Sequence, residues 1–255
     1  MNCTHCNFTS DEASQYCGNC GAVLGATQAG CSTVVGITPA RAANLQAVGQ
    51  LSSAPASPPT GPQVVSEQRE HTVVVHDAST SMGGDCDGRC SKLDASKRAG
   101  GAMVVMKGQI DGEDKVGVVS FNQSATIVLP LMAIAACKAS ILDAIQSLQV
   151  SGGTNINEGL KAARDLFDWT LTDIVRRIIL LTDGQGGDPL HTATDLKARG
   201  VIIDVIGVGK DPSGVNEKLL RAVASVVDGE VRYRFIKDSQ TLVNHYTELA
   251  GKTRT

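Results

Sequence analysis

Short apolar runs alternate with stretches of helical periodicity through most of the chain, from about residue 70 to residue 252. The run 178–181 contains only Ile and Leu, as is typical of a central parallel strand that is buried on both faces. Leu160, Ala163 and Phe167 recur at intervals of three or four residues, which indicates an amphipathic helix. This alternation predicts a doubly wound α/β domain over residues 70–252, with a mostly parallel sheet flanked by helices.

Two adjacent glycines, Gly100 and Gly101, stand inside one predicted helix, where each costs about 1 kcal/mol relative to alanine. We therefore expect this helix to approach the sheet closely at the glycines. The predicted strands cover residues 72–75, 116–121, 125–129, 178–181, 201–208 and 232–236, and the predicted helices cover residues 92–107, 141–148, 156–167, 215–226 and 239–251.

The composition changes in residues 26–69, where Ala, Ser, Thr, Gly, Gln and Pro dominate and five of the eight prolines occur. Such a segment buries too little apolar surface to order itself, so we expect a flexible linker. Thr38 followed by Pro39 is typical of a helix start and allows a short helix over residues 40–51.

Four cysteines in residues 1–25 have the spacing of a zinc site. They form two C-x2-C pairs separated by ten residues, Cys3 with Cys6 and Cys17 with Cys20. Two such knuckles can close a tetrahedral Zn²⁺ site, and the segment resembles the short zinc ribbons that begin many bacterial multidomain proteins. Because so short a segment cannot fold on hydrophobic burial alone, bound zinc would supply its folding free energy. Two structural disulfides are the alternative, which a cytoplasmic location disfavours.

The charge of the chain bears on its partners. The net charge is -3, the isoelectric point is about 5.9, and residues 1–40 contain no Lys or Arg. Because phosphate binding depends on Lys and Arg, these features argue against direct nucleic-acid binding. The N-terminus lacks the features of a secretory signal, and no apolar run approaches the roughly 18 residues of a membrane-spanning helix. We therefore expect a cytoplasmic protein without a membrane span.

Five residues with side-chain oxygens stand where a predicted strand ends or a loop meets a helix: Asp77, Ser79, Ser81, Thr154 and Asp183. In doubly wound sheets, ligands bind outside the carboxyl ends of the strands, so segments far apart in the sequence can meet there. Two carboxylates and three hydroxyls suit a small divalent cation such as Mg²⁺. Taken singly, each of these residues is also common in turns and helix caps.

The three segments that contain these residues resemble the metal-ion-dependent adhesion site (MIDAS) of the von Willebrand factor A domain family. The first has the pattern Asp-x-Ser-x-Ser, preceded by the apolar run Val73-Val74-Val75 and followed by Met and Gly. Gly-Gly-Thr-Asn-Ile around Thr154 and Leu-Leu-Thr-Asp-Gly around Asp183 follow in order. The resemblance covers roughly residues 70 to 250.

The resemblance implies a site for Mg²⁺ or Mn²⁺. Ser79 and Ser81 would bind the metal directly through their hydroxyls, and Thr154 would bind it directly or through water. Asp77 and Asp183 would act largely through waters or through hydrogen bonds to the serines. A cation held mainly by neutral hydroxyls keeps much of its positive charge and could attract an Asp or Glu carboxylate of a protein partner.

Two features depart from the family pattern. His76 precedes Asp77 where an apolar residue is usual; it is either a buried, hydrogen-bonded histidine, which we favour, or a neighbour that tunes the site with pH. The loop 83–90 looks longer than usual. Its Cys86 and Cys90 could form a disulfide, help to bind a second metal or remain free thiols, and we favour free thiols.

These features together predict a non-catalytic, cytoplasmic adaptor that binds a protein partner through the metal site, while the zinc ribbon docks elsewhere. No Ser-His-Asp arrangement has a nucleophile-elbow context, and residues 207–210 complete neither a Walker loop nor a dinucleotide fingerprint. One alternative is a subunit of a nucleic-acid-linked complex of the transcription or repair type that uses the ribbon. A less favoured alternative is a metal-dependent hydrolase or phosphatase in which the cation activates water.

Overall fold

The computed structural model describes residues 68–184 and 186–251. The predicted zinc ribbon with its four cysteines, and the predicted linker with its short helix, lie outside the described residues. The described part contains all five residues of the predicted oxygen cluster.

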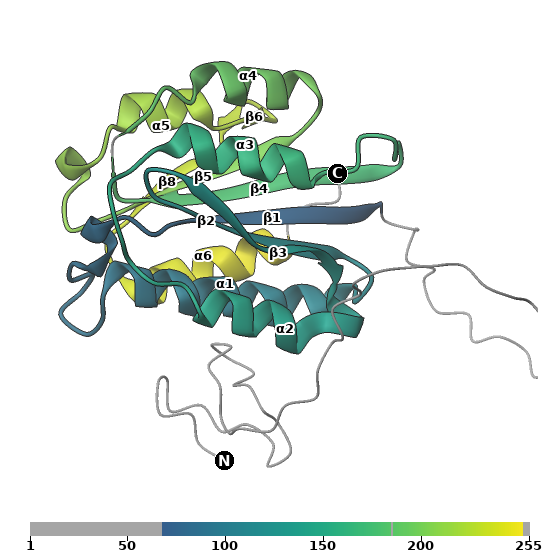
Figure 1. Ribbon diagram of the computed structural model, residues 1–255, viewed down its shortest axis with the longest axis horizontal. Helices are drawn as coiled ribbons and strands as arrows, with labels where there is room; N and C mark the ends of the chain where they lie inside the picture. The colour runs from purple at the N-terminus through teal and green to yellow at the C-terminus, as the bar shows by residue number, and fades with distance from the viewer. Residues whose placement is uncertain (1–67, 185, 252–255) are drawn as a thin grey trace, which may run out of the picture. The chain divides into compact units, whose positions relative to one another are not determined.

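A six-stranded sheet forms the middle layer of the described domain (Figure 1). Its strand order is β3-β2-β1-β4-β5-β8, and all neighbouring strands are parallel except β2 and β3, which are antiparallel. The strands are β1 (Arg69–Asp77), β2 (Lys115–Phe121), β3 (Ala125–Ala133), β4 (Ile174–Thr182), β5 (Ile202–Val208) and β8 (Tyr233–Ile236), and a separate antiparallel pair consists of β6 (Val226–Val227) and β7 (Glu230–Val231).

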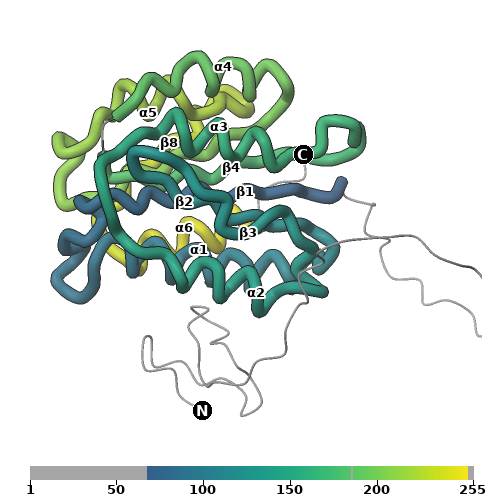
Figure 2. The backbone as a smooth tube through the Cα atoms, in the orientation of Figure 1, coloured from purple at the N-terminus to yellow at the C-terminus, as the bar shows by residue number. Residues whose placement is uncertain are grey.

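Helices cover both faces of the sheet and confirm the predicted α/β architecture (Figure 1). Helices α1 and α6 run side by side although they lie far apart in the sequence (Figure 2). No helix within residues 68–184 and 186–251 is long and apolar enough to cross a membrane. One face carries α1 (Lys92–Ile110), α2 (Ile134–Gln146) and α6 (Ser239–Gly251), and the other carries α3 (Ile156–Leu166), α4 (Leu190–Ala198) and α5 (Glu217–Val223).

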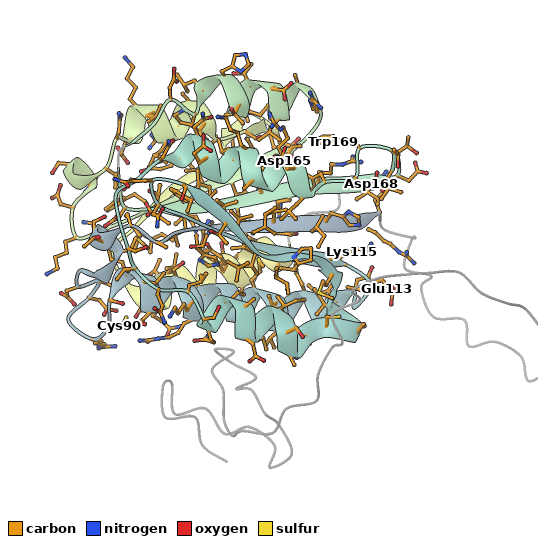
Figure 3. The ribbon with its side chains drawn as sticks, viewed as in Figure 1. Cys90, Glu113, Lys115, Asp165, Asp168 and Trp169 are labelled. Carbon is orange, nitrogen blue, oxygen red and sulfur yellow. The ribbon has the colours of Figure 1, made fainter. Side chains whose placement is uncertain are left out.

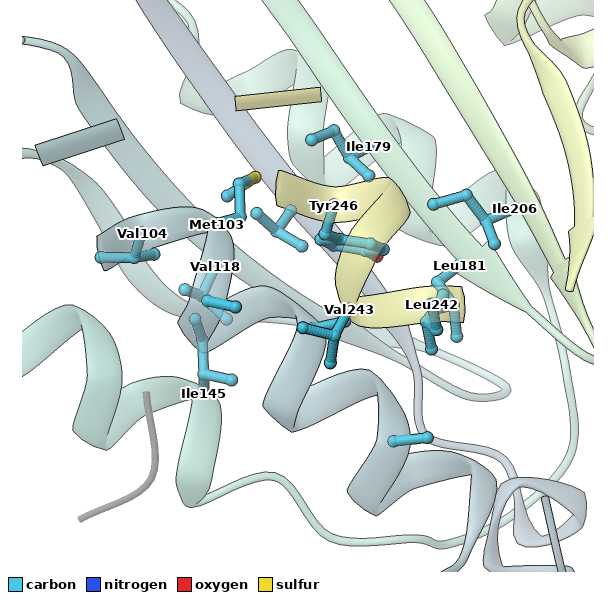
Figure 4. Packing of buried hydrophobic residues seen from close by; sticks show 14 of the residues in the cluster. Met103, Val104, Val118, Ile145, Ile179, Leu181, Ile206, Leu242, Val243 and Tyr246 are labelled. Atoms are coloured by element: carbon cyan, nitrogen blue, oxygen red, sulfur yellow. The ribbon is translucent and has the colours of Figure 1, made fainter. Parts of the chain in front are cut away.

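Alternate residues of the central strands supply two hydrophobic cores. Ile179 of β4 lies in the core that also contains Met103 of α1 and Tyr246 of α6 (Figure 4). Its neighbour Ile178 lies in the other core with Leu160 of α3. All five side chains are completely buried. Burial of one such side chain contributes about 1.5–3 kcal/mol, so both helical layers stabilise the central strands.

Three helices differ from the predicted elements. Helix α2 begins at Ile134, seven residues before the predicted range 141–148. Helix α4 was not predicted, because only three of its nine residues are buried and the apolar signal is weak. Helix α5 is shorter than the predicted range 215–226. The side chain of Asn216 accepts a hydrogen bond from the backbone N–H of Leu219 at 3.1 Å and so begins the helix, and the extended backbone of Ala224 ends it.

Strand β1 is longer than the predicted strand 72–75 because buried polar residues continue it at both ends. At its start, Lys107 Nζ lies 2.9 Å from Glu70 Oε1 and 3.1 Å from Asp114 Oδ2, and each of the three side chains is at most 1% exposed. Burial opposes ionisation of Glu70, but the charges of Arg177 and Lys107 bring its pKa below the ordinary value. An apolar pattern does not reveal such buried ion pairs, and the strand was therefore predicted too short.

The packing around Gly100 explains why a glycine stands at this position inside α1. A methyl group at Gly100 would lie 3.3 Å from His76 Cε1 on β1 and 3.5 Å from Ile145 Cδ1 on α2. The first distance is tighter than ordinary van der Waals contact, so a larger residue would push α1 away from the sheet. The expected close approach of this helix to the sheet is thus confirmed at Gly100.

The strand order determines where a ligand can bind. From β1 the sheet extends through β2 to β3 on one side and through β4 and β5 to β8 on the other, so β1 and β4 flank a topological switch point. His76 of β1 pairs with Leu181 of β4, which brings Asp77 and Thr182 side by side at the carboxyl ends of the two strands.

Candidate metal site

Asp77, the last residue of β1, is completely buried and accepts two hydrogen bonds from neutral groups. Its Oδ1 accepts from the backbone N–H of Ser79 at 2.8 Å, and its Oδ2 accepts from Thr182 Oγ1 at 2.5 Å. Burial raises the pKa of Asp77; these hydrogen bonds oppose the rise, and the negative charge of Asp183 adds to it. A carboxylate in this position would gain from a nearby cation.

A chain of short contacts joins the two serines to the second carboxylate. Ser79 Oγ lies 3.0 Å from Ser81 Oγ, and Ser81 Oγ donates to Asp183 Oδ1 at 2.8 Å. The turn that places them follows β1 directly and continues into the 3-10 helix η1 (Thr80–Gly83), whose Met82 is completely buried. Residues separated by about 100 positions in the sequence therefore meet at the carboxyl ends of the central strands β1 and β4.

The spacing of these oxygens fits a small octahedral cation. Mg²⁺ binds oxygens at about 2.1 Å in octahedral geometry, which places adjacent ligands roughly 3.0 Å apart. The separations of 3.0 Å and 2.8 Å along the chain from Ser79 through Ser81 to Asp183 agree with that spacing. The predicted donors are two carboxylates and three hydroxyls. Residues 68–184 and 186–251 contain no group of three or more His, Cys, Asp or Glu that could hold a metal.

Thr154 lies at the same end of the sheet. Among the described residues, it is not part of the chain of hydrogen bonds that joins Ser79, Ser81 and Asp183. It lies against the loop after Asp183: a methyl group at Gly184 would be 3.1 Å from Thr154 Oγ1, and one at Gly186 would clash with the Thr154 carbonyl oxygen. The N–H of Ile156 also donates to the Gly186 carbonyl at 3.2 Å. Only glycine fits at Gly186, which keeps the Thr154 and Asp183 loops together.

Three residues that the sequence analysis did not assign to the site support it. Thr182 donates to Asp77, and the hydroxyl of Thr80 donates to the Gly152 carbonyl at 3.0 Å, which ties η1 to the loop before α3. Lys92, the first residue of α1, places Nζ 2.5 Å from Asp183 Oδ2. Thr182 and Thr80 stand inside the recognised motifs, whereas no local pattern points to Lys92.

His76 points away from the predicted cation site. Its Nδ1 lies 2.6 Å from Ser96 Oγ of α1, and its side chain is completely buried. Burial, helped by the charge of Lys97, lowers the pKa of His76 to about 3, so the ring stays neutral at physiological pH. This agrees with the favoured interpretation of a buried, hydrogen-bonded histidine.

The loop before α1 contains two free thiols, Cys86 and Cys90, as favoured from the sequence. Figure 3 shows Cys90 in this loop, at the end of the domain opposite Trp169. Burial raises the pKa of Cys86 to about 11. The loop is attached to α6, because Asp87 Oδ2 accepts hydrogen bonds from the N–H and the hydroxyl of Ser239 at 3.1 and 2.5 Å.

An open pocket of about 410 Å³ adjoins the oxygen cluster. The loops that follow β1, β4 and β5 form its walls, and Lys92, Asp183, Asp85 and Lys210 are among the residues that line it. Lys210 Nζ lies 2.9 Å from Asp85 Oδ2 in an exposed ion pair. The candidate metal site thus opens into a space lined by charges of both signs.

Comparison with known proteins agrees with this architecture. A family model of the von Willebrand factor type A domain matches residues 72–248. The chain is 30% identical over 130 residues to uncharacterized protein sll0103 of Synechocystis sp., covering 49% of this chain and 30% of that protein. It is 29% identical over 141 residues to uncharacterized protein YfbK of Escherichia coli, covering 52% of this chain and 24% of that protein. The chain therefore spans less than a third of the length of these relatives.

Solved structures share the fold. Proximal thread matrix protein 1 from the mussel byssus superposes with a TM-score of 0.60 at 24% identity, over 72% of this chain and 48% of that chain. A structure of the same byssus protein with a zinc-occupied MIDAS motif gives 0.58 at 26% identity, over 72% and 46%. A von Willebrand factor type A protein from Catenulispora acidiphila gives 0.58 at 26% identity, over 73% and 42%.

Proposed function

The chain belongs to the von Willebrand factor type A family, and we propose that it binds a protein partner by capturing a partner carboxylate on a divalent cation. Domains of this family commonly mediate protein–protein interactions, and many hold a divalent metal. In this proposal the cation is Mg²⁺ or Mn²⁺, and its ligands, direct or through water, are Asp77, Ser79, Ser81, Thr154 and Asp183.

The observation that carries the proposal is the convergence of oxygens from distant segments: Ser79 Oγ lies 3.0 Å from Ser81 Oγ, and Ser81 Oγ donates to Asp183 Oδ1 at 2.8 Å, separations compatible with adjacent ligands of an octahedral site. Thr154 lies at the same edge, beside the loop that follows Asp183. The raised pKa of Asp77, caused first by burial, adds a reason for a cation to bind there.

The hydroxyl-rich donor set favours capture of an anion. Neutral hydroxyls donate electron density to a cation without cancelling its charge, whereas inner-shell carboxylates would neutralise it. Asp77 and Asp183 are already engaged by Thr182, Ser81 and Lys92. A cation bound to the serines would therefore keep part of its charge for a carboxylate of the partner, at the mouth of the adjoining pocket.

The N-terminal cysteines extend the proposal to an adaptor. Zn²⁺ bound by Cys3, Cys6, Cys17 and Cys20 would fold a second small module, and the linker would let that module engage another surface. In this proposal the protein acts in the cytoplasm and does not contact nucleic acid directly.

A non-catalytic role is part of the proposal. Hydrolysis of a bound substrate would need a general base near the metal-bound water. His76, the one histidine considered for that role, is neutral, buried and directed toward Ser96 of α1. This orientation favours ligand capture over hydrolysis.

The experiment is a pull-down from lysate with the full chain, in Mg²⁺ and after chelation, read by mass spectrometry. The test variant is Ser79→Ala/Ser81→Ala, which removes two hydroxyls without adding bulk. The matched control is Thr172→Ala, because Thr172 is exposed before β4 at the opposite edge of the sheet. Zinc content and thermal unfolding are measured in every sample, because a chelator would also remove zinc from the cysteines.

The proposal expects a set of partners that the wild type and Thr172→Ala retain in Mg²⁺. The serine variant and the chelated wild type should both lose those partners. If the folded serine variant captures the same partners as the wild type, the metal site does not carry binding, and the function moves to the cysteine module or the linker.

A further inference from the structure

Lys92 forms an ion pair with one carboxylate oxygen of Asp183, the carboxylate that lies beside the two serines. Its Nζ is 2.5 Å from Asp183 Oδ2, while Ser81 Oγ donates to Oδ1 of the same carboxylate at 2.8 Å. The side chain of Asp183 is 1% exposed and that of Lys92 is 18% exposed. Both oxygens of Asp183 are therefore satisfied by the chain itself.

The ammonium group changes the charge of the site. Asp77 and Asp183 together contribute two negative charges, and Lys92 reduces the total to one. A divalent cation added to this set leaves one net positive charge, whereas without Lys92 it would leave none. The ammonium group also repels the cation, since both are positive.

We propose that Lys92 sets the balance between cation affinity and anion capture: it weakens the hold on the divalent cation and leaves the bound cation attractive to a carboxylate ligand. This inference rests on the proposed function. Lys92 acts through Asp183 and through its charge, so it is a positioning residue rather than a ligand of the metal.

The pocket beside the site also places Lys92 where it can attract an anion that binds the cation. Lys92 lines this pocket together with Asp183, so a carboxylate that binds the cation from the pocket would also approach the ammonium group. Cation and ammonium group would then attract the same anion from neighbouring positions.

The test is Lys92→Met in the full chain, a change that keeps an unbranched side chain, one heavy atom shorter than lysine, and removes its charge. Mn²⁺ alone is the cation probe, with free Mn²⁺ measured by electron paramagnetic resonance. A cation close to Asp183 lies within roughly 7 Å of Lys92 Nζ, so even the dielectric constant of water predicts binding about tenfold tighter in the variant. The Ser79→Ala/Ser81→Ala variant supplies the background from other Mn²⁺ sites on the chain.

Acetate is the anion probe, followed through the water-proton relaxation of bound Mn²⁺, which falls when acetate displaces a bound water. Acetate should bind to the Mn²⁺ form of Lys92→Met about fivefold or more weakly than to that of the wild type. Two controls accompany this variant. Lys92→Arg keeps the charge and should behave as the wild type. Lys210→Met removes a different, exposed lysine from the same pocket and should change both affinities less than Lys92→Met does, because salt screens an exposed charge.

Opposite changes in the two affinities would support the inference, because simple damage to the site would weaken both. Equal affinities in Lys92→Met and the wild type, or a loss of both, would overturn it while leaving the proposed function intact. If the wild type binds no more Mn²⁺ than the serine variant, the proposed function fails, and the inference fails with it.

Discussion

Replacing Asp77 by Asn should make the cation-free protein more stable and should abolish stabilisation by Mg²⁺. The carboxylate is completely buried, and burial together with the charge of Asp183 raises its pKa. Asparagine has the same shape, and its carbonyl oxygen can still accept the hydrogen bond from the N–H of Ser79. Thr182 Oγ1, which now donates to Asp77, can instead accept from the new amide group.

The direction of this change in stability follows from the direction of the pKa shift of Asp77. Because the pKa of Asp77 is higher in the folded than in the unfolded protein, ionisation of this group opposes folding at neutral pH. Removing the charge should raise the free energy of unfolding of the cation-free protein by about 1–2 kcal/mol at pH 7. The difference should vanish below the unfolded pKa, where the carboxyl group is protonated in both states.

The response to Mg²⁺ should have the opposite sign. A ligand at 100 times its dissociation constant stabilises the folded state by about 2.7 kcal/mol. For a domain of this size, each kcal/mol shifts the midpoint of thermal unfolding by about 2–4 °C. The wild type should therefore gain roughly 5–10 °C in saturating Mg²⁺, and Asp77→Asn should gain less than about 1 °C.

Urea unfolding without divalent cations and thermal unfolding with and without Mg²⁺ measure the two effects. Asp165→Asn is the matched control, since Asp165 is an exposed carboxylate on α3 that lies away from the site (Figure 3). It should change neither quantity by more than about 0.5 kcal/mol. The reasoning is refuted if Asp77→Asn is less stable than the wild type without cation, or if it keeps the full Mg²⁺ shift.

Three further outcomes are expected. Lys107→Met leaves Glu70 and Asp114 buried without this partner, and it should lower the free energy of unfolding by about 3–5 kcal/mol at pH 7. Urea unfolding measures this loss. A loss below about 1 kcal/mol would contradict the idea that Lys107 stabilises the two buried carboxylates. Because the folded pKa of Glu70 is lowered, its contribution to stability should be present above the unfolded pKa and lost as pH falls through the folded value, so the gap between wild type and Lys107→Met should narrow in acid. Gly186→Ala should push the Thr154 carbonyl away and weaken Mn²⁺ binding about tenfold or more in calorimetry, and unchanged affinity would show that this contact does not position the site.

Much of the oxygen cluster could be predicted from the sequence because its residues stand at the ends of recognisable strands. The apolar runs before Asp77 and Asp183 mark β1 and β4, and these strands flank the switch point, so their carboxyl ends meet. The spacing Asp-x-Ser-x-Ser also fixes a local geometry, since the N–H of Ser79 closes a turn on Asp77 Oδ1. Local pattern and topology thus identify the same edge.

Contacts between distant side chains could not be predicted in this way. Lys92 meets Asp183 only because the sheet places α1 beside the end of β4. The length of β1 depends in the same way on Lys107, which pairs with Glu70 from a helix packed against the strand. Hydrophobic periodicity does not report such pairs, since it records which positions are buried and not which buried charges meet.

The two ends of β1 show why an added cation belongs at one of them. Glu70, near the start of the strand, is buried beside Lys107 and within reach of the charge of Arg177, and its pKa is lowered despite burial. Asp77, at the end of the same strand, is equally buried, but the groups that hydrogen-bond it are neutral, and its pKa is raised. The chain supplies Lys107 and the charge of Arg177 at the first end, whereas at the second end Lys92 pairs with the neighbouring carboxylate of Asp183. A buried carboxylate that lacks a positively charged hydrogen-bond partner is stabilised most by a cation from solution. The electrostatics therefore favour a cation at the carboxyl ends of β1 and β4, where the hydroxyl oxygens also have a suitable spacing.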